Sequence, residues 1–464
     1  MSEPTGNTAP GALHALLRRL HFYIGFLVGP FLLVAAVSGV LYALTPQIES
    51  HLYEHALHTD SQGPSLSLAR MIRSAQAVAG PSVPVTAVRP APAQGDTTRI
   101  LFAMPGLGPS EYRAIFIDPV SGQIRGDMKV YGTSGVLPLR TWIDQFHRGL
   151  LLGDIGRLYS ELAASWLWVA ALGGLILWLV QRRKKNVTAK AQKKGMRQLH
   201  ATLGLCLLIG LLFFSTTGLT WSQWAGENIG VLRAHWGWST PGVSTTLGQS
   251  QAMNSPLDEH AGHHMAGMTM LMSTSSSDLS VFDAVLTKAR VEGIDASRVE
   301  IRPPSGPNKA WTVTEIDRRW PTRVDAVAID AATLTVVDKV VFAQYPLAAK
   351  LTRWGIDAHM GVLFGLANQL VLVAFASGLV VMVVMGYLMW WRRRPTLALK
   401  EGRAITLLSA WRALGRGAQL AVVSVALLLG VALPVLGWSL LGLVAWDAWL
   451  TVVRSPVALV ENKA

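Results

Sequence analysis

Cysteine is almost absent from this sequence, and charged residues are scarce. Cys206 is the single cysteine among 464 residues, which excludes an intramolecular disulfide and a thiolate metal site. Lysine, arginine, aspartate and glutamate make up only 15% of the chain, whereas 51% of it is hydrophobic. The apolar residues are gathered into blocks instead of being spread periodically. This composition indicates a membrane protein.

The apolar blocks predict membrane-spanning helices, since crossing a hydrocarbon core takes about 20 apolar helical residues. Four blocks meet this length: 22–44, 158–180, 201–221 and 366–391. A last block, 418–453, is too long for one span and is interrupted by Pro434 and Gly437, so we expect a hairpin of two short spans. No small-residue cleavage site follows the first block, which is therefore expected to be a retained helix.

Acidic residues are missing from the short loop between the second and third blocks. The bases of this loop are Arg182, Arg183, Lys184, Lys185, Lys190, Lys193, Lys194 and Arg197. A second basic group, from Arg392 to Arg416, follows the fourth block, and Arg18 and Arg19 precede the first. The positive-inside rule makes these segments cytoplasmic. The net charge of +13 is thus a topology signal and not a nucleic-acid site, and six spans leave both termini inside.

Two long segments, 45–157 and 222–357, are then expected outside, in the periplasm of a bacterial inner membrane. Each has the pattern of a small α+β module. The expected helices are Leu66–Val78 and Val281–Val291, and the expected strands are Thr98–Met104, Tyr112–Ile117, Ala310–Ile316 and Arg323–Ile329. Residues 81–92 are rich in proline and predict a turn. A tight turn is also expected at Asp118–Gly122, with a looser counterpart beginning at Asp330.

Internal repeats organise the chain at two constant offsets. At an offset of 212, Trp142, His147, Gly153, Gly174 and Trp178 recur as Trp354, His359, Gly365, Gly386 and Trp390; at an offset of 179, His21, Gly25 and Gly39 recur as His200, Gly204 and Gly218. Parallel repeats imply a pseudo-two-fold axis along the membrane normal. A single membrane-edge histidine is more often an interfacial side chain, but four at repeated positions favour ligands for metal or haem.

Three segments resemble one known family. Leu20–Gly25, Asp118–Gly122 and Phe146–Arg157, the last with the pattern HRxLLLGDxGR, are similar to the PepSY-associated transmembrane family. The resemblance covers residues 13 to about 395. Characterised members of that family include inner-membrane ferrisiderophore reductases that carry haem b. The resemblance therefore implies an α-helical membrane protein with a four-helix core of two parallel repeats, a C-terminal helical hairpin and two PepSY-like outer modules.

Topology sorts the four histidines into two pairs, each expected to hold one haem b. His21 and His200 begin helices at the inner face, whereas His147 and His359 precede helices at the outer face. Two imidazoles leave no open iron position, which favours electron transfer. Gly25 and Gly204, one turn after their histidines, would make room for a flat macrocycle. The expected partners of the propionates are Arg148 and Arg353 for the outer haem and Arg19 and Arg197 for the inner haem.

The expected function is electron transfer across the membrane to a ferric-siderophore or other ferric chelate outside, that is, a ferric-siderophore reductase. Neither a GxGxxG turn nor an inner domain for nicotinamide or flavin is evident, so the donor would be quinol or a separate reductase. A PepSY-type binding or regulatory protein, which needs no haem, stays an alternative. A transporter is disfavoured, because the spans contain few internal charges.

A segment rich in histidine and methionine, residues 260–272, breaks the repeat. Imidazole and thioether ligands suit copper, so a cupric reductase is a further alternative, although such a loop can also be a flexible linker. The possible copper ligands are His260, His263, His264, Met265, Met268 and Met270. Four other histidines receive no role: His51, His55, His58 and His235.

The expected segments follow from these boundaries. They are the cytoplasmic N-terminal segment 1–19, the first span 20–44, the first outer module 45–140, an interfacial helix with the second span 141–180, a basic loop 181–197, the third span 198–224, the second outer module 225–350, an interfacial helix with the fourth span 351–391, a basic loop 392–417, the hairpin 418–453 and the tail 454–464.

Overall fold

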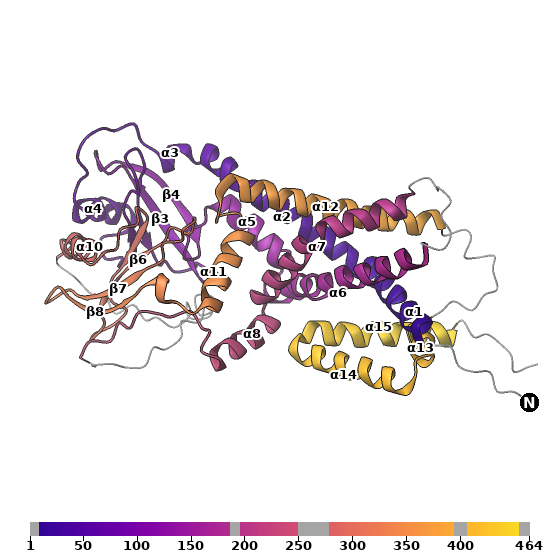
Figure 1. Ribbon diagram of the computed structural model, residues 1–464. Helices are drawn as coiled ribbons and strands as arrows, with labels where there is room; N and C mark the ends of the chain where they lie inside the picture. Colours follow the sequence, from indigo (N-terminus) through magenta and orange to yellow (C-terminus); the bar gives the residue numbers. More distant parts are fainter. Residues whose placement is uncertain (1–8, 186–194, 249–277, 394–405, 454–464) are drawn as a thin grey trace, which may run out of the picture. The chain divides into compact units, whose positions relative to one another are not determined.

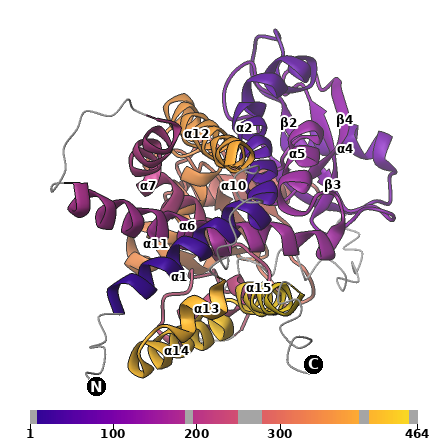
Figure 2. The same cartoon turned by 90° about the vertical axis from the view of Figure 1, so that its right-hand side faces the viewer.

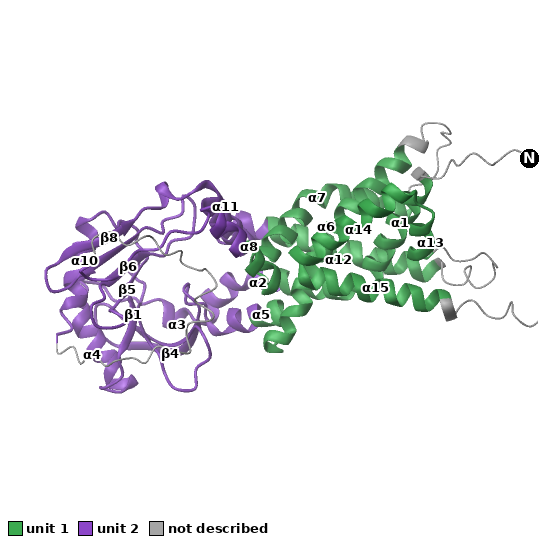
Figure 3. Ribbon diagram, turned by 90° about the horizontal axis from the view of Figure 1, so that it is seen from below, with its two compact units in different colours: residues 1–40, 145–229, 371–464 green, residues 41–144, 230–370 purple. Residues whose placement is uncertain are grey.

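The computed structural model describes residues 9–185, 195–248, 278–393 and 406–453. They belong to two compact units, coloured separately in Figure 3: unit 1 comprises residues 1–40, 145–229 and 371–464, and unit 2 comprises residues 41–144 and 230–370. The chain passes from one unit to the other inside four helices. These are α2 (Gly29–Leu52), α5 (Pro138–Gly149), α8 (Trp224–His235) and α12 (Gly365–Arg393).

Unit 1 is built from long apolar helices. Besides its parts of α2, α5, α8 and α12, it contains α1 (Ala9–Tyr23), the π-helical turn η1 (Ile24–Val28), α6 (Gly153–Lys185), α7 (Met196–Thr220), α13 (Leu407–Arg412), α14 (Arg416–Ala432) and α15 (Pro434–Val453). Four helical stretches of the described chain are long and apolar enough to cross a membrane: Gly11–Leu52, Gly153–Arg182, Met196–Thr220 and Gly365–Arg392. They cover the four long blocks expected from the sequence except for Trp221, which follows the end of α7. The protein is a helical membrane protein.

Glycines let the helices of unit 1 approach closely. A Cβ at Gly210 of α7 would come within 2.1 Å of the Phe375 ring of α12, and a Cβ at Gly378 of α12 would come within 2.7 Å of Leu207 of α7. A large side chain of each helix therefore packs directly against a glycine of the other helix. Such close packing is the main source of helix association in lipid, where the hydrophobic effect between helices is lost.

The last apolar block folds as the expected hairpin, α14–α15, drawn in yellow in Figure 2. A Cβ at Gly437 would lie 2.7 Å from the Cα of Gly430, so the two helices meet at these glycines. The buried carboxylate of Asp447 accepts a hydrogen bond from the Tyr23 hydroxyl (2.5 Å) and another from the Leu408 backbone N–H (3.0 Å). Asp447 therefore fastens the hairpin to α1 and α13.

Unit 2 contains one antiparallel sheet of eight strands in the order β4-β3-β2-β1-β5-β6-β7-β8. The strands are β1 (Val85–Arg89), β2 (Thr98–Phe102), β3 (Glu111–Ile117), β4 (Ile124–Tyr131), β5 (Val299–Arg302), β6 (Trp311–Glu315), β7 (Ala326–Asp330) and β8 (Thr335–Val340). The helices of this unit, besides its parts of the shared ones, are α3 (Glu54–Leu57), α4 (Leu68–Ala79), α10 (Val281–Val291), the 3-10 turn η3 (Phe342–Gln344) and α11 (Leu347–His359).

The sheet corrects the expectation of two small outer modules. Each repeat does supply four strands and one covering helix, α4 or α10, which lie beside the strands in Figure 1. The two sets are continuous, however, because β1 pairs with β5 through Val88 and Ile301. One apolar core beneath α4 and α10 therefore runs across both repeats. The sequence missed β1, which lies in the proline-rich stretch, because Pro84 and Pro90 bracket the strand without interrupting it.

Both repeats contain the expected Asp turn. The Asp118 carboxylate accepts hydrogen bonds from the backbone N–H of Val120 (2.8 Å) and the hydroxyl of Thr59 (2.8 Å). Asp330 accepts from the Ala332 N–H (3.0 Å). Gly122 has φ +75° in the first turn, and its counterpart Leu334 has φ +53° in the second. The second repeat thus keeps the turn although a leucine occupies a left-handed position, at a cost of roughly 1–2 kcal/mol.

Candidate functional site

His21 lies near the end of α1 and packs against α6. A Cβ at Gly174 would come within 3.3 Å of the His21 Cε1 atom, so the ring rests on a helix surface that lacks a side chain there. The Ala170 backbone lies near the ring. The Nδ1 atom, by contrast, is buried without a hydrogen-bond partner. A buried polar atom left unpaired costs free energy unless a further group binds it.

His200 of α7 has the same character. Its Nδ1 is also buried and without a hydrogen-bond partner, and the Met382 backbone of α12 lies within reach of its ring. His21 and His200 are close enough to interact electrostatically. These are the two histidines that the offset of 179 relates. The structure places them on different helices of one apolar unit.

The two glycines expected to make room beside these histidines differ. Nothing among the described residues lies within 4 Å of a Cβ built at Gly25. At Gly204 such a Cβ would lie 3.1 Å from the Met382 methyl group, which occupies that side of α7. Gly25 also belongs to the π-helical turn η1, a deviation that is frequent at functional sites. Tyr387 supports this turn by donating its hydroxyl to the Phe26 carbonyl at 2.7 Å.

His147 lies in the last full turn of α5, and its ring contacts α2. Its Nδ1 is 2.9 Å from the hydroxyl oxygen of Ser38, and a Cβ at Gly39 would lie 3.5 Å from its Cε1. Its backbone carbonyl accepts a hydrogen bond from the Tyr159 hydroxyl of α6 at 2.5 Å. Both the ring and the backbone of His147 are therefore held by neighbouring helices.

The glycines of the HRxLLLGDxGR pattern form the bend that follows His147. Leu150, Leu151 and Gly153 have positive φ angles of 53°, 60° and 59°, and α6 begins at Gly153. A Cβ at Gly156 would lie 1.8 Å from the Gly149 carbonyl oxygen, so a side chain cannot occupy this place without moving the backbone. The expected break between the interfacial helix and the span is confirmed. The residues of the HRxLLLGDxGR pattern therefore form a close-packed bend between α5 and α6.

His359 ends α11 in unit 2, and a similar bend follows it. Gly361 and Gly365 have positive φ angles of 73° and 58°, and α12 begins at Gly365. The backbone carbonyl of Asp357 accepts from the N–H groups of Val362 (2.8 Å) and Leu363 (3.1 Å). Each histidine of the 212 offset therefore lies near the end of its own helix, α5 or α11. In both places a bend into a long apolar helix follows.

Arg19 and Arg353 are two candidate arginines whose side-chain partners can be named. Arg19 donates to the Tyr23 hydroxyl at 2.9 Å and lies over the Tyr23 ring, 4.5 Å from its centroid. Arg353 donates to the Asp357 carboxylate at 3.1 Å. Arg197 is exposed at the start of α7, and the Arg148 carbonyl accepts from Ser160 at 2.7 Å. Arg19 and Arg353 thus have structural contacts in addition to the propionate role expected for them.

The remaining histidines that the structure describes do not form a metal site of three or more ligands. His55 bonds to the Arg125 carbonyl at 2.9 Å, and His58 lies 3.0 Å from the Asp96 carboxylate. His51 is exposed, as is His235 at the end of α8. No group of three or more His, Cys, Asp or Glu side chains that could hold a metal ion occurs in the described parts of the chain. The His/Met segment 260–272 lies outside them.

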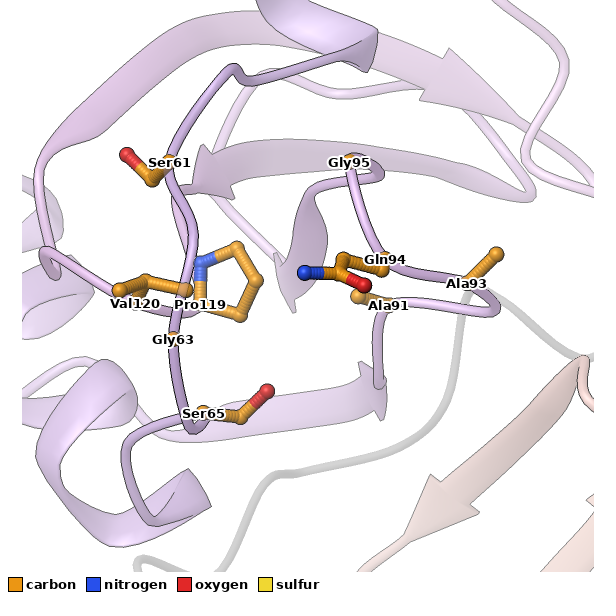
Figure 4. A pocket seen from close by; sticks show the side chains of 9 residues that line it. All are labelled: Ser61, Gly63, Ser65, Ala91, Ala93, Gln94, Gly95, Pro119 and Val120. Carbon is orange, nitrogen blue, oxygen red and sulfur yellow. The ribbon is translucent and has the colours of Figure 1, made fainter.

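One pocket of about 380 Å³ lies in unit 2, where loop 61–65 meets the β1–β2 loop and the β3–β4 turn. Figure 4 shows its lining, in which Ser61, Ser65 and Gln94 are the polar side chains and the rest are Gly, Ala, Pro and Val. None of these residues carries a charge.

Sequence reasoning missed Ser38, Tyr159 and the contacts of two glycines. Gly39 and Gly174 were recognised as repeated residues, but the structure places these glycines, and not Gly204, against histidine rings. Ser38 had a detectable signal: its position 179 residues later is Thr217, so a hydroxyl side chain recurs beside the repeated Gly39 and Gly218. Only its distance from His147 reveals its partner.

Comparison with known families agrees with the resemblance seen in the sequence. The family model described as the PepSY-associated TM region matches residues 18–393, which is most of the 464-residue chain. No curated protein matches closely enough to narrow the assignment further.

Proposed function

The chain belongs to the PepSY-associated TM family, and from this premise we propose that it is a membrane electron-transfer protein that holds two haems b. His21 and His200 are the ligands of the inner haem, and His147 and His359 are the ligands of the outer haem. A haem with two histidine ligands supplies one-electron exchange without an open iron position. The observation that carries the proposal is the pair of imidazoles on α1 and α7, each with a buried Nδ1 that has no hydrogen-bond partner.

The surroundings of the inner pair suit a flat apolar group. Gly174 keeps the α6 surface beside His21 free of a side chain, and the space beside Gly25 is open among the described residues. The apolar cluster of unit 1 includes Ile24, Leu167 and Leu207, which would exclude water from the ligand nitrogens. At Gly204 the Met382 side chain would have to move, and methionine adapts readily because it is unbranched and flexible.

Direction follows from the positive-inside rule applied to the basic loops, which puts His21 and His200 on the cytoplasmic side of a bacterial inner membrane. Electrons would enter there from quinol or a separate reductase and leave near His147 and His359. Unit 2 would then lie outside. The substrate that fits the family resemblance is a ferric siderophore or another ferric chelate.

The test is reoxidation of the dithionite-reduced protein by candidate acceptors. Purified protein in nanodiscs is reduced, excess reductant is removed, and the b-type α-band is followed after adding a ferric siderophore or a cupric chelate. We expect rapid decay with the ferric chelate. Decay with copper alone would favour the cupric reductase, whose proposed ligands His260, His263 and His264 rest on the sequence only.

A protein with no α-band at all would contradict the electron-transfer proposal. The family membership and the membrane fold would stand, and the PepSY-type binding or regulatory function would become the better one. The ferric-chelate proposal alone would fail if the α-band were present but neither chelate oxidised the protein.

A further inference from the structure

Ser38 is a buried hydroxyl in α2 that contacts the His147 ring. Its oxygen lies 2.7 Å from the Val34 carbonyl, 3.2 Å from the Ala35 carbonyl and 2.9 Å from the His147 Nδ1. Its side chain is fully buried. These three atoms and the Tyr159 hydroxyl, which also lies near Ser38, therefore compete for one hydroxyl group. Only one of them can receive its single proton strongly.

The assignment follows from donor and acceptor chemistry. A backbone carbonyl can only accept, so the hydroxyl donates to Val34, the nearest oxygen, in the back-bond common for serine in membrane helices. The hydroxyl oxygen must then accept from His147, which requires a proton on Nδ1. Neutral imidazole carries one proton, so the Nε2 atom keeps its lone pair. The in-plane directions of the two ring nitrogens diverge, so this lone pair points away from Ser38.

We propose that Ser38 is a positioning residue that fixes His147 as the Nδ1–H tautomer and thereby presents Nε2 to the outer haem. The inference rests on the proposed function. Histidines that bind metals commonly donate their other N–H to a polar group, which orients the ring and raises its basicity. Ser38 supplies this group from a different helix, and Gly39 leaves room for the ring beside it.

The second repeat contains a corresponding hydroxyl that is hydrogen-bonded to its own helix backbone. Thr217 stands 179 residues after Ser38, and its hydroxyl lies 2.7 Å from the Phe213 carbonyl and 3.3 Å from the Phe214 carbonyl. The sequence separations equal those of Ser38, and the distances agree to within 0.1 Å. A hydroxyl is kept at this position although the residue type changes.

Loss of the Ser38 hydroxyl should change the outer haem alone. Without an acceptor for Nδ1–H the ring becomes a weaker electron donor, which disfavours ferric relative to ferrous iron. The orientation of the His147 ring is also no longer fixed by a hydrogen bond. We expect Ser38→Ala to raise the midpoint potential of one of the two haems and to weaken its binding by about 10–100-fold. The other haem should keep its potential.

The experiment is a redox titration of the purified, full-length protein, followed by α-band absorbance and by low-temperature electron paramagnetic resonance. Ser38→Thr is the rescue variant, since Thr217 already accommodates a threonine with the same back-bonds. Ser215→Ala is the matched control, because Ser215 is another buried hydroxyl in a membrane helix but donates to the Ala164 carbonyl at 2.6 Å. We expect Ser38→Thr and Ser215→Ala to match the wild type in both signals.

Three results would overturn the inference. The potentials, spectra and haem content of Ser38→Ala could equal those of the wild type, or Ser215→Ala could shift the same haem equally, which would indicate a general packing effect. Wild-type protein without haem would overturn the proposed function together with this inference. That last result is distinct, because the first two require haem-loaded protein.

Discussion

The two repeats have the same residue types at some equivalent positions and different ones at others. Whether they agree depends on where the position lies in the fold. At the histidines, at the hydroxyls Ser38 and Thr217, and at Gly153 and Gly365 the residue types or backbone angles agree closely. At the outer turns the second repeat tolerates Leu334 where the first has Gly122. At Gly174 a histidine ring fills the space, whereas nothing described lies near Gly386. The repeats therefore agree at the candidate ligands and at the bends, but they differ at the glycines that pack beside the ligands.

The largest expected effect comes from removing a ligand in either repeat. His147→Ala and His359→Ala should each remove the outer haem and leave the inner one, so that the haem content falls from two to one per chain. His21→Ala and His200→Ala should do the reverse. Haem content is measured on purified protein by the pyridine haemochrome absorbance. Loss of both haems after a single change would argue against the pairing.

The next largest effect concerns the pairing of β1 with β5, which joins the two repeats in the sheet. Glu300 of β5 is buried and forms ion pairs with Arg89 (2.6 Å) and Arg302 (2.5 Å). Glu300→Ala leaves a buried arginine unpaired, which typically costs about 3–5 kcal/mol. Thermal unfolding of the full-length protein should show a lower transition temperature. Glu292→Ala, which removes the partly exposed pair with Lys288, is the control and should change the transition temperature much less.

The same glutamate predicts the pH dependence of this unit. Burial acts to raise the pKa of Glu300, but the charges of Arg89 and Arg302 and their hydrogen bonds hold the pKa below its ordinary value. Its contribution to stability is therefore full above the unfolded-state pKa of about 4.3 and declines as the pH falls below that value toward the folded-state pKa. Acid titration of the transition temperature should show this decline in the wild type and a smaller one in Glu300→Gln.

The contrast between Gly174 and Gly386 should separate a ligand contact from ordinary helix packing. A Cβ added at Gly174 would lie only 3.3 Å from the His21 ring. Gly174→Leu should therefore displace the ring at a cost of about 1–3 kcal/mol. That corresponds to roughly 5- to 150-fold weaker binding of the inner haem. Gly386→Leu should leave the haem content unchanged, because the described structure has open space there. Equal loss in both variants would refute the contact.

The smallest effect distinguishes the two outer turns. Leu334→Gly removes left-handed strain and should stabilise unit 2 by about 0.5–1 kcal/mol after the entropy cost of glycine. Gly122→Ala should instead destabilise it by about 1 kcal/mol, since φ is +75° and the new Cβ would lie 3.1 Å from Leu66. Both changes are measurable as shifts of the transition temperature. Stabilisation by Gly122→Ala would contradict the equivalence of the turns.

The membrane helices and the repeat could be predicted from the sequence because their signals are long and local. Apolar blocks of span length, Gly153 at the bend and the Asp118 turn each depend on neighbouring residues. The hairpin was visible from Pro434, which begins α15. Short strands carried less signal: β1 and β5 have only five and four residues, and their pairing joins segments that lie more than 200 positions apart.

The environment of the ligands could be predicted only in part. The histidines were visible because they recur at fixed offsets, whereas the π-helical turn at Gly25 depends on Tyr387, a residue on α12. Ser38 looked like an ordinary helix serine until its distance to His147 was known. The expectation for Gly204 did not anticipate that Met382 would occupy the adjoining space. Contacts between distant helices decide these features, and local spacing does not encode them.

The most direct test of the central claim is the haem-to-chain ratio of the purified wild-type protein, measured together with its reduced-minus-oxidised spectrum. Four repeated histidines in two pairs predict a ratio of two and a b-type α-band. A ratio of zero, with a featureless difference spectrum after expression under haem-sufficient conditions, would contradict it.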